Sequence, residues 1–127
     1  SGLNFLLLED RFLLLADTTV NINPTAEQLS VIALQAAQVC EYFGVQPQIA
    51  MLSYSNFTNA PGTPAKMRRA AELVKAKRPE ILVDGDMQAD TAVNTEIQRS
   101  IFPFCELKSG ANILVFPNLE SSNIAYK

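Results

Sequence analysis

The stretch N-P-T-A-E-Q-L-S-V-I-A-L-Q-A-A-Q-V-C-E-Y-F-G-V-Q-P-Q-I-A-M-L, from Asn23 to Leu52, decides the fold class of this chain. Its apolar residues recur at helical spacing between Leu29 and Phe43, and Gly44 is typical of a helix end. The apolar run Ile49–Leu52 that follows is typical of a short buried strand. A helix leading directly into a buried strand is the repeating unit of layered α/β domains.

The start of this helix admits two caps. Asn23 can cap a helix whose first residue is Pro24, because proline has no N–H to leave unpaired there. Thr25 with Gln28 instead has the pattern of a capping box. Both alternatives stay open from the sequence.

The elements on either side extend the same pattern. Upstream, Leu3–Leu8 and Phe12–Ala16 are apolar runs joined by a polar turn, which predicts a β-hairpin covered on both faces. Downstream, the pattern predicts helices over 64–78 and 94–101, strands over 81–83 and 112–116, and a helix start over 120–127. We therefore expect a three-layer α/β fold with a largely parallel or mixed sheet and an N-terminal β-hairpin, in one unit spanning residues 1–127.

Composition excludes several classes of function. The 127 residues are 48% hydrophobic and 18% charged, so the chain can bury a core. The sequence has no His, which excludes an imidazole base, a Ser-His-Asp triad and a His-ligated metal within it. A formal net charge of −3 argues against nucleic-acid and anionic-membrane partners.

The cysteines and the N-terminal segment bear on the compartment. Cys40 and Cys105 form no C-x-x-C motif, so we expect reduced, partly buried thiols. The apolar start is interrupted at Glu9–Arg11 and lacks a basic leader, which argues against a signal peptide or membrane span. We expect a cytoplasmic protein.

Two charged clusters each have two interpretations. Asp84, Asp86 and Asp90 follow a predicted strand and would either hold a cation such as Mg²⁺ or form turns and caps; we expect no metal site. Six basic residues gather in the predicted second helix, and they form either a solvated face or a local anion site. These residues are Lys66, Arg68, Arg69, Lys75, Lys77 and Arg78.

Neutral polar residues follow the predicted strands. Ser53, Ser55 and Asn56 follow one buried strand, and Asn118 follows another. In open α/β sheets, ligands bind beyond the carboxyl ends of the strands. These side chains, with Asp17–Thr19, either meet at one edge to bind a phosphate, pantetheine or carbonyl group or satisfy loop backbone. No glycine-rich nucleotide motif is present.

Four ordered motifs carry a family resemblance. They are A-D-T-T-V-N-I-N-P (16–24), A-M-L-S-Y-S-N-F (50–57), V-D-G-D-M-Q-A-D (83–90), and F-P-N-L (116–119) followed by N-I-A-Y-K (123–127). Together they resemble the phosphate acetyltransferase (phosphotransacetylase) family, and most closely the C-terminal domain of bacterial NADP-dependent malic enzymes. Stand-alone acetyltransferases usually carry a serine-, lysine- and glycine-bearing loop at 55–57, and glycine where this chain has Ser122.

The resemblance implies a fold and a position within it. The family has two α/β subdomains around a cleft, in an architecture related to isocitrate and isopropylmalate dehydrogenases, and this chain resembles the inserted subdomain. The family's catalytic Ser-Arg pair lies beyond the position of Lys127. We therefore expect a fragment of a longer polypeptide, with no catalytic residue of its own.

Three functions follow as hypotheses. The first is a regulatory, acetyl-CoA-binding and oligomerisation domain of a malic enzyme whose other parts use NADP and Mg²⁺ or Mn²⁺. The second is part of an active phosphate acetyltransferase. The third is a dimerisation module that uses the hairpin and Phe102–Phe104. For the first, the expected ligand-binding residues are Ser53, Ser55, Asn56, Asn118, Asn123 and Lys127. The expected partners are acetyl-CoA or a related CoA ester and further copies of the chain.

Overall fold

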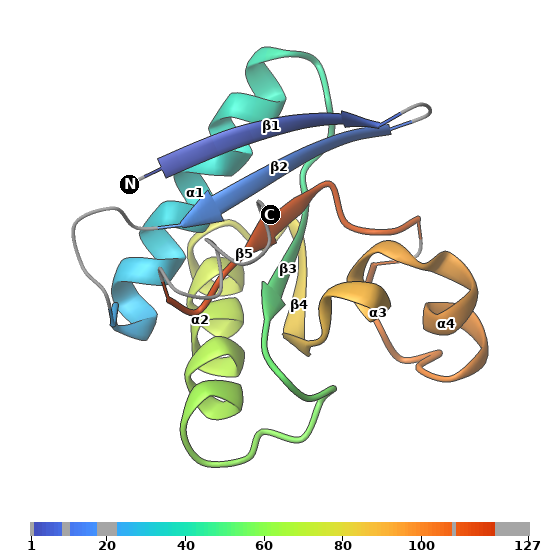
Figure 1. The fold of residues 1–127 in the computed structure, drawn as a ribbon. Helices are drawn as coiled ribbons and strands as arrows, with labels where there is room; N and C mark the ends of the chain where they lie inside the picture. The colour runs from blue at the N-terminus through green and yellow to red at the C-terminus, as the bar shows by residue number, and fades with distance from the viewer. Residues whose placement is uncertain (1, 9–10, 18–22, 108, 119–127) are drawn as a thin grey trace.

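The computed structural model describes residues 2–8, 11–17, 23–107 and 109–118. Strands and helices alternate along most of the chain (Figure 1). In chain order the elements are β1 (Gly2–Leu8), β2 (Arg11–Asp17), α1 (Ala26–Tyr42), β3 (Gln48–Leu52), α2 (Thr63–Lys77), β4 (Leu82–Met87), α3 (Ala89–Val93), α4 (Thr95–Ser100) and β5 (Ile113–Val115).

The described strands form one sheet in the order β1-β2-β5-β3-β4. Strands β1 and β2 pair antiparallel, while β2, β5, β3 and β4 run parallel to their neighbours. This confirms the predicted hairpin and the largely parallel sheet. Strand β5 is the last in the described chain, yet it lies between β2 and β3. Its register places Val115 beside Ala16 on one side and Met51 on the other.

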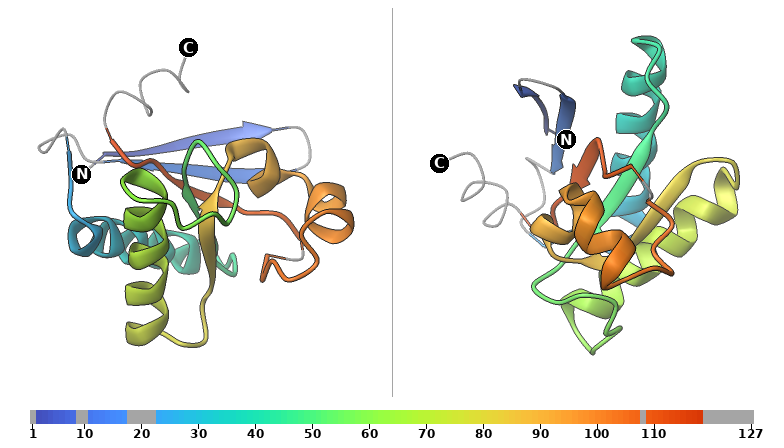
Figure 2. Two further views of the ribbon diagram at one scale, coloured as in Figure 1. Left: turned by 90° about the horizontal axis from the view of Figure 1, so that it is seen from below. Right: turned by 90° about the vertical axis from the view of Figure 1, so that its right-hand side faces the viewer.

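Apolar side chains are buried on both faces of the sheet. Helices α1 and α2 pack on one face, where Leu14 and Met51 of the strands meet Leu29 and Met67 of the helices. On the other face, Leu15 and its neighbours pack against α3 and the segment that precedes β5. Figure 2 shows the sheet between these two layers. The three-layer prediction is therefore confirmed, and both faces of β2 are covered because each meets its own core cluster.

The first helix uses the capping box. The Thr25 hydroxyl accepts the N–H of Gln28 at 3.1 Å, and the Gln28 side-chain oxygen accepts the N–H of Thr25 at 2.8 Å. Asn23 is therefore not the cap, and its side-chain oxygen instead accepts a hydrogen bond from Lys66. Gly44, predicted at the helix end, has a φ of 75°, in the left-handed region that favours glycine.

Two sequence predictions were wrong around Asp84. Strand β4 runs on through Asp84 and Asp86 to Met87, where the composition predicted that the strand ends before Asp84. A short helix, α3, then begins at Ala89, where no helix was predicted. The polar strand is stable because the Asp84 carboxylate accepts the N–H groups of Gly85 and Glu106. These tertiary contacts outweigh the local preference of Asp-Gly-Asp for a turn. The predicted helix start at 120–127 lies outside the described residues.

Both cysteines are free and fully buried, rather than partly buried as expected. Burial, with a smaller contribution from the neighbouring Glu41 charge, raises the pKa of the Cys40 thiol to about 11. A protonated, buried thiol is a poor nucleophile. Within the described part of the chain, no helix has both the length and the apolarity needed to cross a membrane.

Candidate ligand site at the carboxyl ends of the strands

A pocket of about 250 Å³ opens where β3 and β5 end. Because these strands are parallel neighbours, the residues that follow them meet at one edge of the sheet. Its lining comes from the ends of both strands and the starts of α2 and α3: Leu52, Ser53, Tyr54, Thr63, Ala89, Phe116, Pro117 and Asn118. The structure thus brings together Ser53 and Asn118, which the sequence analysis placed after two separate strands.

The pocket combines apolar walls with neutral polar groups. Leu52, Phe116 and Pro117 supply apolar surface, while Ser53, Thr63 and Asn118 are polar. None of the described residues that line it carries a charge. A mostly apolar hollow with a few neutral donors and acceptors suits an extended ligand that contains alkyl, amide and thioester groups.

Ser55 and Asn56, also predicted to bind ligand, make hydrogen bonds within the protein. Neither residue lines the pocket. The Ser55 hydroxyl lies 3.0 Å from the Thr58 hydroxyl and donates weakly to Asp86. The Asn56 side chain exchanges hydrogen bonds with Gln88: its amide donates to the side-chain oxygen at 3.1 Å, and its oxygen accepts the Gln88 N–H at 2.8 Å. Here both side chains bind their own loop to the end of β4.

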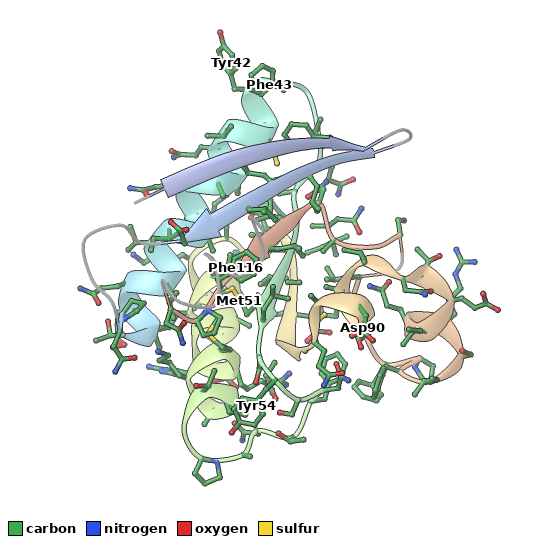
Figure 3. All side chains as sticks on the ribbon, in the orientation of Figure 1. Tyr42, Phe43, Met51, Tyr54, Asp90 and Phe116 are labelled. Atoms are coloured by element: carbon green, nitrogen blue, oxygen red, sulfur yellow. The ribbon has the colours of Figure 1, made fainter. Side chains whose placement is uncertain are left out.

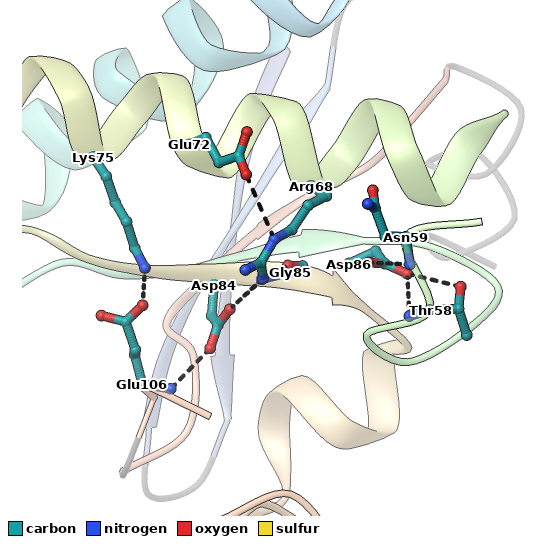
Figure 4. A network of polar contacts seen from close by, with 9 residues as sticks. All are labelled: Thr58, Asn59, Arg68, Glu72, Lys75, Asp84, Gly85, Asp86 and Glu106. Atoms are coloured by element: carbon teal, nitrogen blue, oxygen red, sulfur yellow. Dashed lines mark hydrogen bonds and ion pairs between the residues drawn. The ribbon is translucent and has the colours of Figure 1, made fainter. Parts of the chain in front are cut away.

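Asp86 binds the same loop through its carboxylate (Figure 4). Its side chain is fully buried, and its carboxylate accepts the N–H groups of Thr58 and Asn59 at 3.2 and 3.3 Å. These two backbone donors converge because Phe57 and Asn59 adopt positive φ values of 54° and 51°. The carboxylate therefore serves as an internal anion that holds the loop after β3.

The outer edge of β4 is closed by Arg68 from α2. Its guanidinium donates to the Gly85 carbonyl at 2.8 Å and lies 3.5 Å from the Asp84 carboxylate. Burial raises the pKa of Asp84 above its usual value, and the Gly85 N–H and nearby Lys75 and Arg68 charges partly oppose that rise.

A second hollow, of about 280 Å³, adjoins this edge. It is lined by Phe57, Asn59, Arg68, Asp86 and Phe104. Of the two interpretations of the Asp cluster, the contacts of Asp84 and Asp86 favour internal hydrogen bonding. Among the residues that the structure describes, no group of three or more His, Cys, Asp or Glu side chains is placed to hold a metal ion.

Four of the six clustered basic residues hold elements together. Besides Arg68, Lys75 pairs with Glu106, and Arg78 donates to both Glu41 and Glu80. Lys66 donates to oxygen atoms of Asn23, Pro24 and Pro117. The cluster is thus neither a freely solvated face nor a single anion site, because its members point to separate partners.

Sequence reasoning missed Thr63, Tyr54 and Ala89 as pocket residues. Thr63 begins α2, and in parallel α/β units the helix starts lie at the same edge as the strand ends, so Gly62-Thr63-Pro64 was an available signal. Asp17 ends β2 beside this edge and is buried, but it does not line the pocket. Asn123 and Lys127, also predicted to bind ligand, lie outside the described residues.

Known structures share this fold. The EutD phosphotransacetylase from Staphylococcus aureus superposes with a TM-score of 0.89 and 31% identity, covering 99% of this chain and 40% of that one. A phosphotransacetylase from Streptococcus pyogenes gives a TM-score of 0.82 at 34% identity, covering 92% of this chain and 36% of that one. The fold is thus that of a transacylase-like α/β protein.

The chain belongs to the phosphate acetyl/butaryl transferase family, whose sequence pattern matches residues 1–127. Two kinds of curated relative are similar to it. The phosphate acetyltransferase of Buchnera aphidicola subsp. Acyrthosiphon pisum is 41% identical over 128 residues, covering 100% of this chain and 18% of that enzyme. The NADP-dependent malic enzyme of Escherichia coli K12 is 44% identical over 127 residues, covering 98% of this chain and 17% of that enzyme. The chain therefore spans only a small part of these relatives.

Proposed function

We propose that this chain binds acetyl-CoA or a related CoA ester in the strand-end pocket and acts as an effector-binding domain. The observation that carries the proposal is the uncharged lining of that pocket, where Ser53, Thr63 and Asn118 sit among apolar side chains. The pantetheine arm of a CoA ester carries amide, hydroxyl, alkyl and thioester groups without charge. Hydroxyl and amide side chains are suitable hydrogen-bond partners for those groups.

Binding without catalysis is the second part of this proposal. Acyl transfer to phosphate needs a cationic clamp for the phosphate, a base for the thiol and donors for the oxyanion. Among the described residues that line the pocket, none supplies a positive charge or an ordinary general base. This argues that the chain contributes a binding surface, and that any catalytic groups come from elsewhere in a longer polypeptide.

The same proposal assigns the chain to an NADP-dependent malic enzyme as a regulatory domain. Support comes from the 44% identity to the Escherichia coli malic enzyme and from the S-N-F sequence at 55–57. NADP and Mg²⁺ or Mn²⁺ would serve oxidative malate decarboxylation in other parts of that enzyme. Among the residues described here, no group of three or more His, Cys, Asp or Glu side chains is placed to hold a metal ion. A cytoplasmic location and an origin as one subdomain of a two-subdomain unit remain part of the proposal.

Homo-oligomerisation also remains a proposal. The apolar segment Phe102–Phe104 is a candidate for part of a dimer surface. Phe104 is 63% exposed, which leaves it available for such contact, whereas Phe102 packs against the core. Sedimentation velocity of wild type and Phe104→Ser tests this role: a wild-type monomer at high concentration contradicts it.

The test of the main proposal is a calorimetric titration of the chain with acetyl-CoA, CoA and acetyl phosphate. We expect acetyl-CoA to bind and acetyl phosphate, which lacks the pantetheine arm, not to bind. Asn118→Ala should weaken acetyl-CoA binding, while Phe43→Ala, at the far end of α1 from Tyr54 in Figure 3, should not. Binding of acetyl phosphate alone, or equal binding by both variants and wild type, would contradict the site.

The regulatory role needs its own measurement. In a malic enzyme that carries this chain, acetyl-CoA should change the rate of NADP-dependent malate oxidation, and Asn118→Ala should blunt that change without altering the basal rate. An unchanged rate and oligomer size at saturating acetyl-CoA would refute the regulatory role.

A second candidate, part of an active phosphate acetyltransferase, is favoured by the 41% identity to the Buchnera enzyme. Acetyl exchange between CoA and phosphate in a longer protein carrying this chain would support it. Exchange activity together with no effect on malate oxidation would replace the first proposal.

A further inference from the structure

Lys66 connects three segments that are far apart in the sequence. Its ammonium group donates to the Asn23 side-chain oxygen at 3.2 Å, to the Pro24 carbonyl at 3.0 Å and to the Pro117 carbonyl at 3.3 Å. These partners lie 43, 42 and 51 positions away along the chain. A lysine ammonium has three donors, and the three oxygens use all of them.

This arrangement spans the strand-end pocket. Thr63, one turn before Lys66 in α2, lines the pocket, and so does Pro117, the partner of Lys66 after β5. Neighbours three residues apart lie on the same side of a helix. The ammonium therefore joins the wall that begins α2 to the wall that follows β5.

The partners of Lys66 are neutral, which distinguishes it from the other paired bases of α2. Lys75 and Arg68 lie beside carboxylates, whereas the ammonium group of Lys66 donates to two backbone carbonyls and an amide side-chain oxygen. Burial lowers the pKa of Lys66, because removing water disfavours its charged form. Placing the Lys66 ammonium group here therefore costs desolvation free energy that an exposed lysine would not lose. The three hydrogen bonds of Lys66 offset this cost.

We infer that Lys66 is a positioning residue that fixes the separation of Thr63 and Pro117, and with it the affinity of the strand-end pocket. The part concerning affinity rests on the proposed CoA-ester site. Lys66 does not itself line the pocket, so it acts through Pro117 and the adjoining Asn118.

The buried cysteines allow a test with a matched chemical control. In Lys66→Cys the new thiol replaces a half-buried side chain, while Cys40 and Cys105 are 0% and 1% exposed. Alkylation with 2-bromoethylamine forms a C–S bond, releases bromide and restores an ammonium group at nearly the length of lysine. Lys66→Cys should bind acetyl-CoA about tenfold more weakly, as expected from the loss of charged hydrogen bonds. Alkylation should restore most of that affinity.

Two further measurements separate positioning from general stability. Hydrogen exchange over 115–118 should speed up in Lys66→Cys and slow again after alkylation, a readout that does not require any CoA ester. Lys75→Cys, which removes the ion pair to Glu106, should leave both exchange and affinity unchanged. Unaltered exchange over 115–118 would overturn the positioning role. Altered exchange with no wild-type acetyl-CoA binding would retain that role and refute the proposed function instead.

Discussion

The strand-end pocket and the outer edge of β4 both gather polar side chains beyond a buried strand, yet they differ in how those groups are satisfied. At the β4 edge, Asp86 accepts the donors of its loop and Arg68 donates to Gly85. At the pocket, Ser53 and Asn118 face a hollow of about 250 Å³. A hollow of about 280 Å³ also borders the β4 edge, so open space alone does not mark a ligand site. The two regions differ because Asp86 and Arg68 bond to neighbouring backbone groups, whereas the lining of the strand-end pocket is uncharged.

Ser53 and Ser55 make this contrast within one short segment. Ser53 follows β3 directly and lines the pocket, with its N–H donated to the Met87 carbonyl at 2.8 Å. Ser55, two residues on, bonds to Thr58 and Asp86 and belongs to the loop. Two serines with similar sequence context therefore differ in place: Ser53 lines the pocket, and Ser55 bonds within its loop.

The largest expected effect is the loss of stability on replacing Gly85 in β4. In Gly85→Ala, the new Cβ would lie 2.6 Å from the Met51 carbonyl oxygen and 2.8 Å from the Met51 Cβ. Neither atom can move without distorting β3, so we expect a loss of about 4 kcal/mol or failure to fold. Urea denaturation measures the change. Gly44→Ala is the control, because Gly85 and Gly44 both have a positive φ, of 153° and 75°. No described atom lies within 4 Å of a Cβ at Gly44, so only about 1 kcal/mol should be lost there. Equal losses at both positions would contradict the packing argument.

Removing the internal anion should loosen the loop while leaving the pocket intact. Asp86→Ala leaves the N–H groups of Thr58 and Asn59 without their acceptor, which should cost about 2 to 3 kcal/mol. Thermal unfolding gives the loss, and hydrogen exchange over 55–60 should rise. Acetyl-CoA affinity should stay within about twofold of wild type, since Asp86 does not line the pocket. A large loss of acetyl-CoA affinity would show that the β4 edge and the strand-end pocket act as one site.

A smaller effect should separate the two serines. Ser53→Ala removes a pocket hydroxyl and should weaken acetyl-CoA binding about fivefold, with little change in stability. Ser55→Ala should leave binding unchanged and cost about 0.5 kcal/mol through lost loop contacts. Calorimetry and denaturation of both variants measure these changes. The reverse pattern would place the ligand against the loop.

The smallest expected effect is a pH dependence from Asp84. Its pKa in the folded protein is raised above 3.8, chiefly by burial. Between 3.8 and the raised value, the folded protein holds more protons than the unfolded chain, so this group makes stability fall as pH rises. Relative to Asp84→Asn, wild type should therefore lose stability on going from pH 3.5 through that window. Denaturation midpoints at several pH values measure this, and a difference that grows in favour of wild type would contradict it.

Much of the fold was predictable because local signals agreed with tertiary packing. The capping box at Thr25, the glycine at 44 and the apolar periodicity between them lie within one helix and its ends. The predicted strand was too short at β4, because Asp-Gly-Asp favours turns locally. In the structure Glu106, 22 residues from Asp84, donates its N–H to the Asp84 carboxylate. No local pattern carries that information.

The site was less predictable, because it depends on sheet order. Ser53 and Asn118 become neighbours only since β5 pairs with β3. The separation of Ser55 from the pocket depends on Asp86 drawing the loop toward β4. Residue types therefore drew attention to this edge of the sheet, and strand pairing decided which of those residues line the strand-end pocket.

The place of β5 in the sheet has a consequence during synthesis. A ribosome synthesises β2 and β3 well before β5 (Ile113–Val115). Strand β5 nevertheless pairs with both of them and so joins the β1-β2 hairpin to the β3-β4 pair. Until β5 emerges, β2 and β3 each present a bare apolar edge, and the early chain is a target for chaperones and for mispairing. Folding of the nascent chain should therefore be withheld until its last described strand has been made.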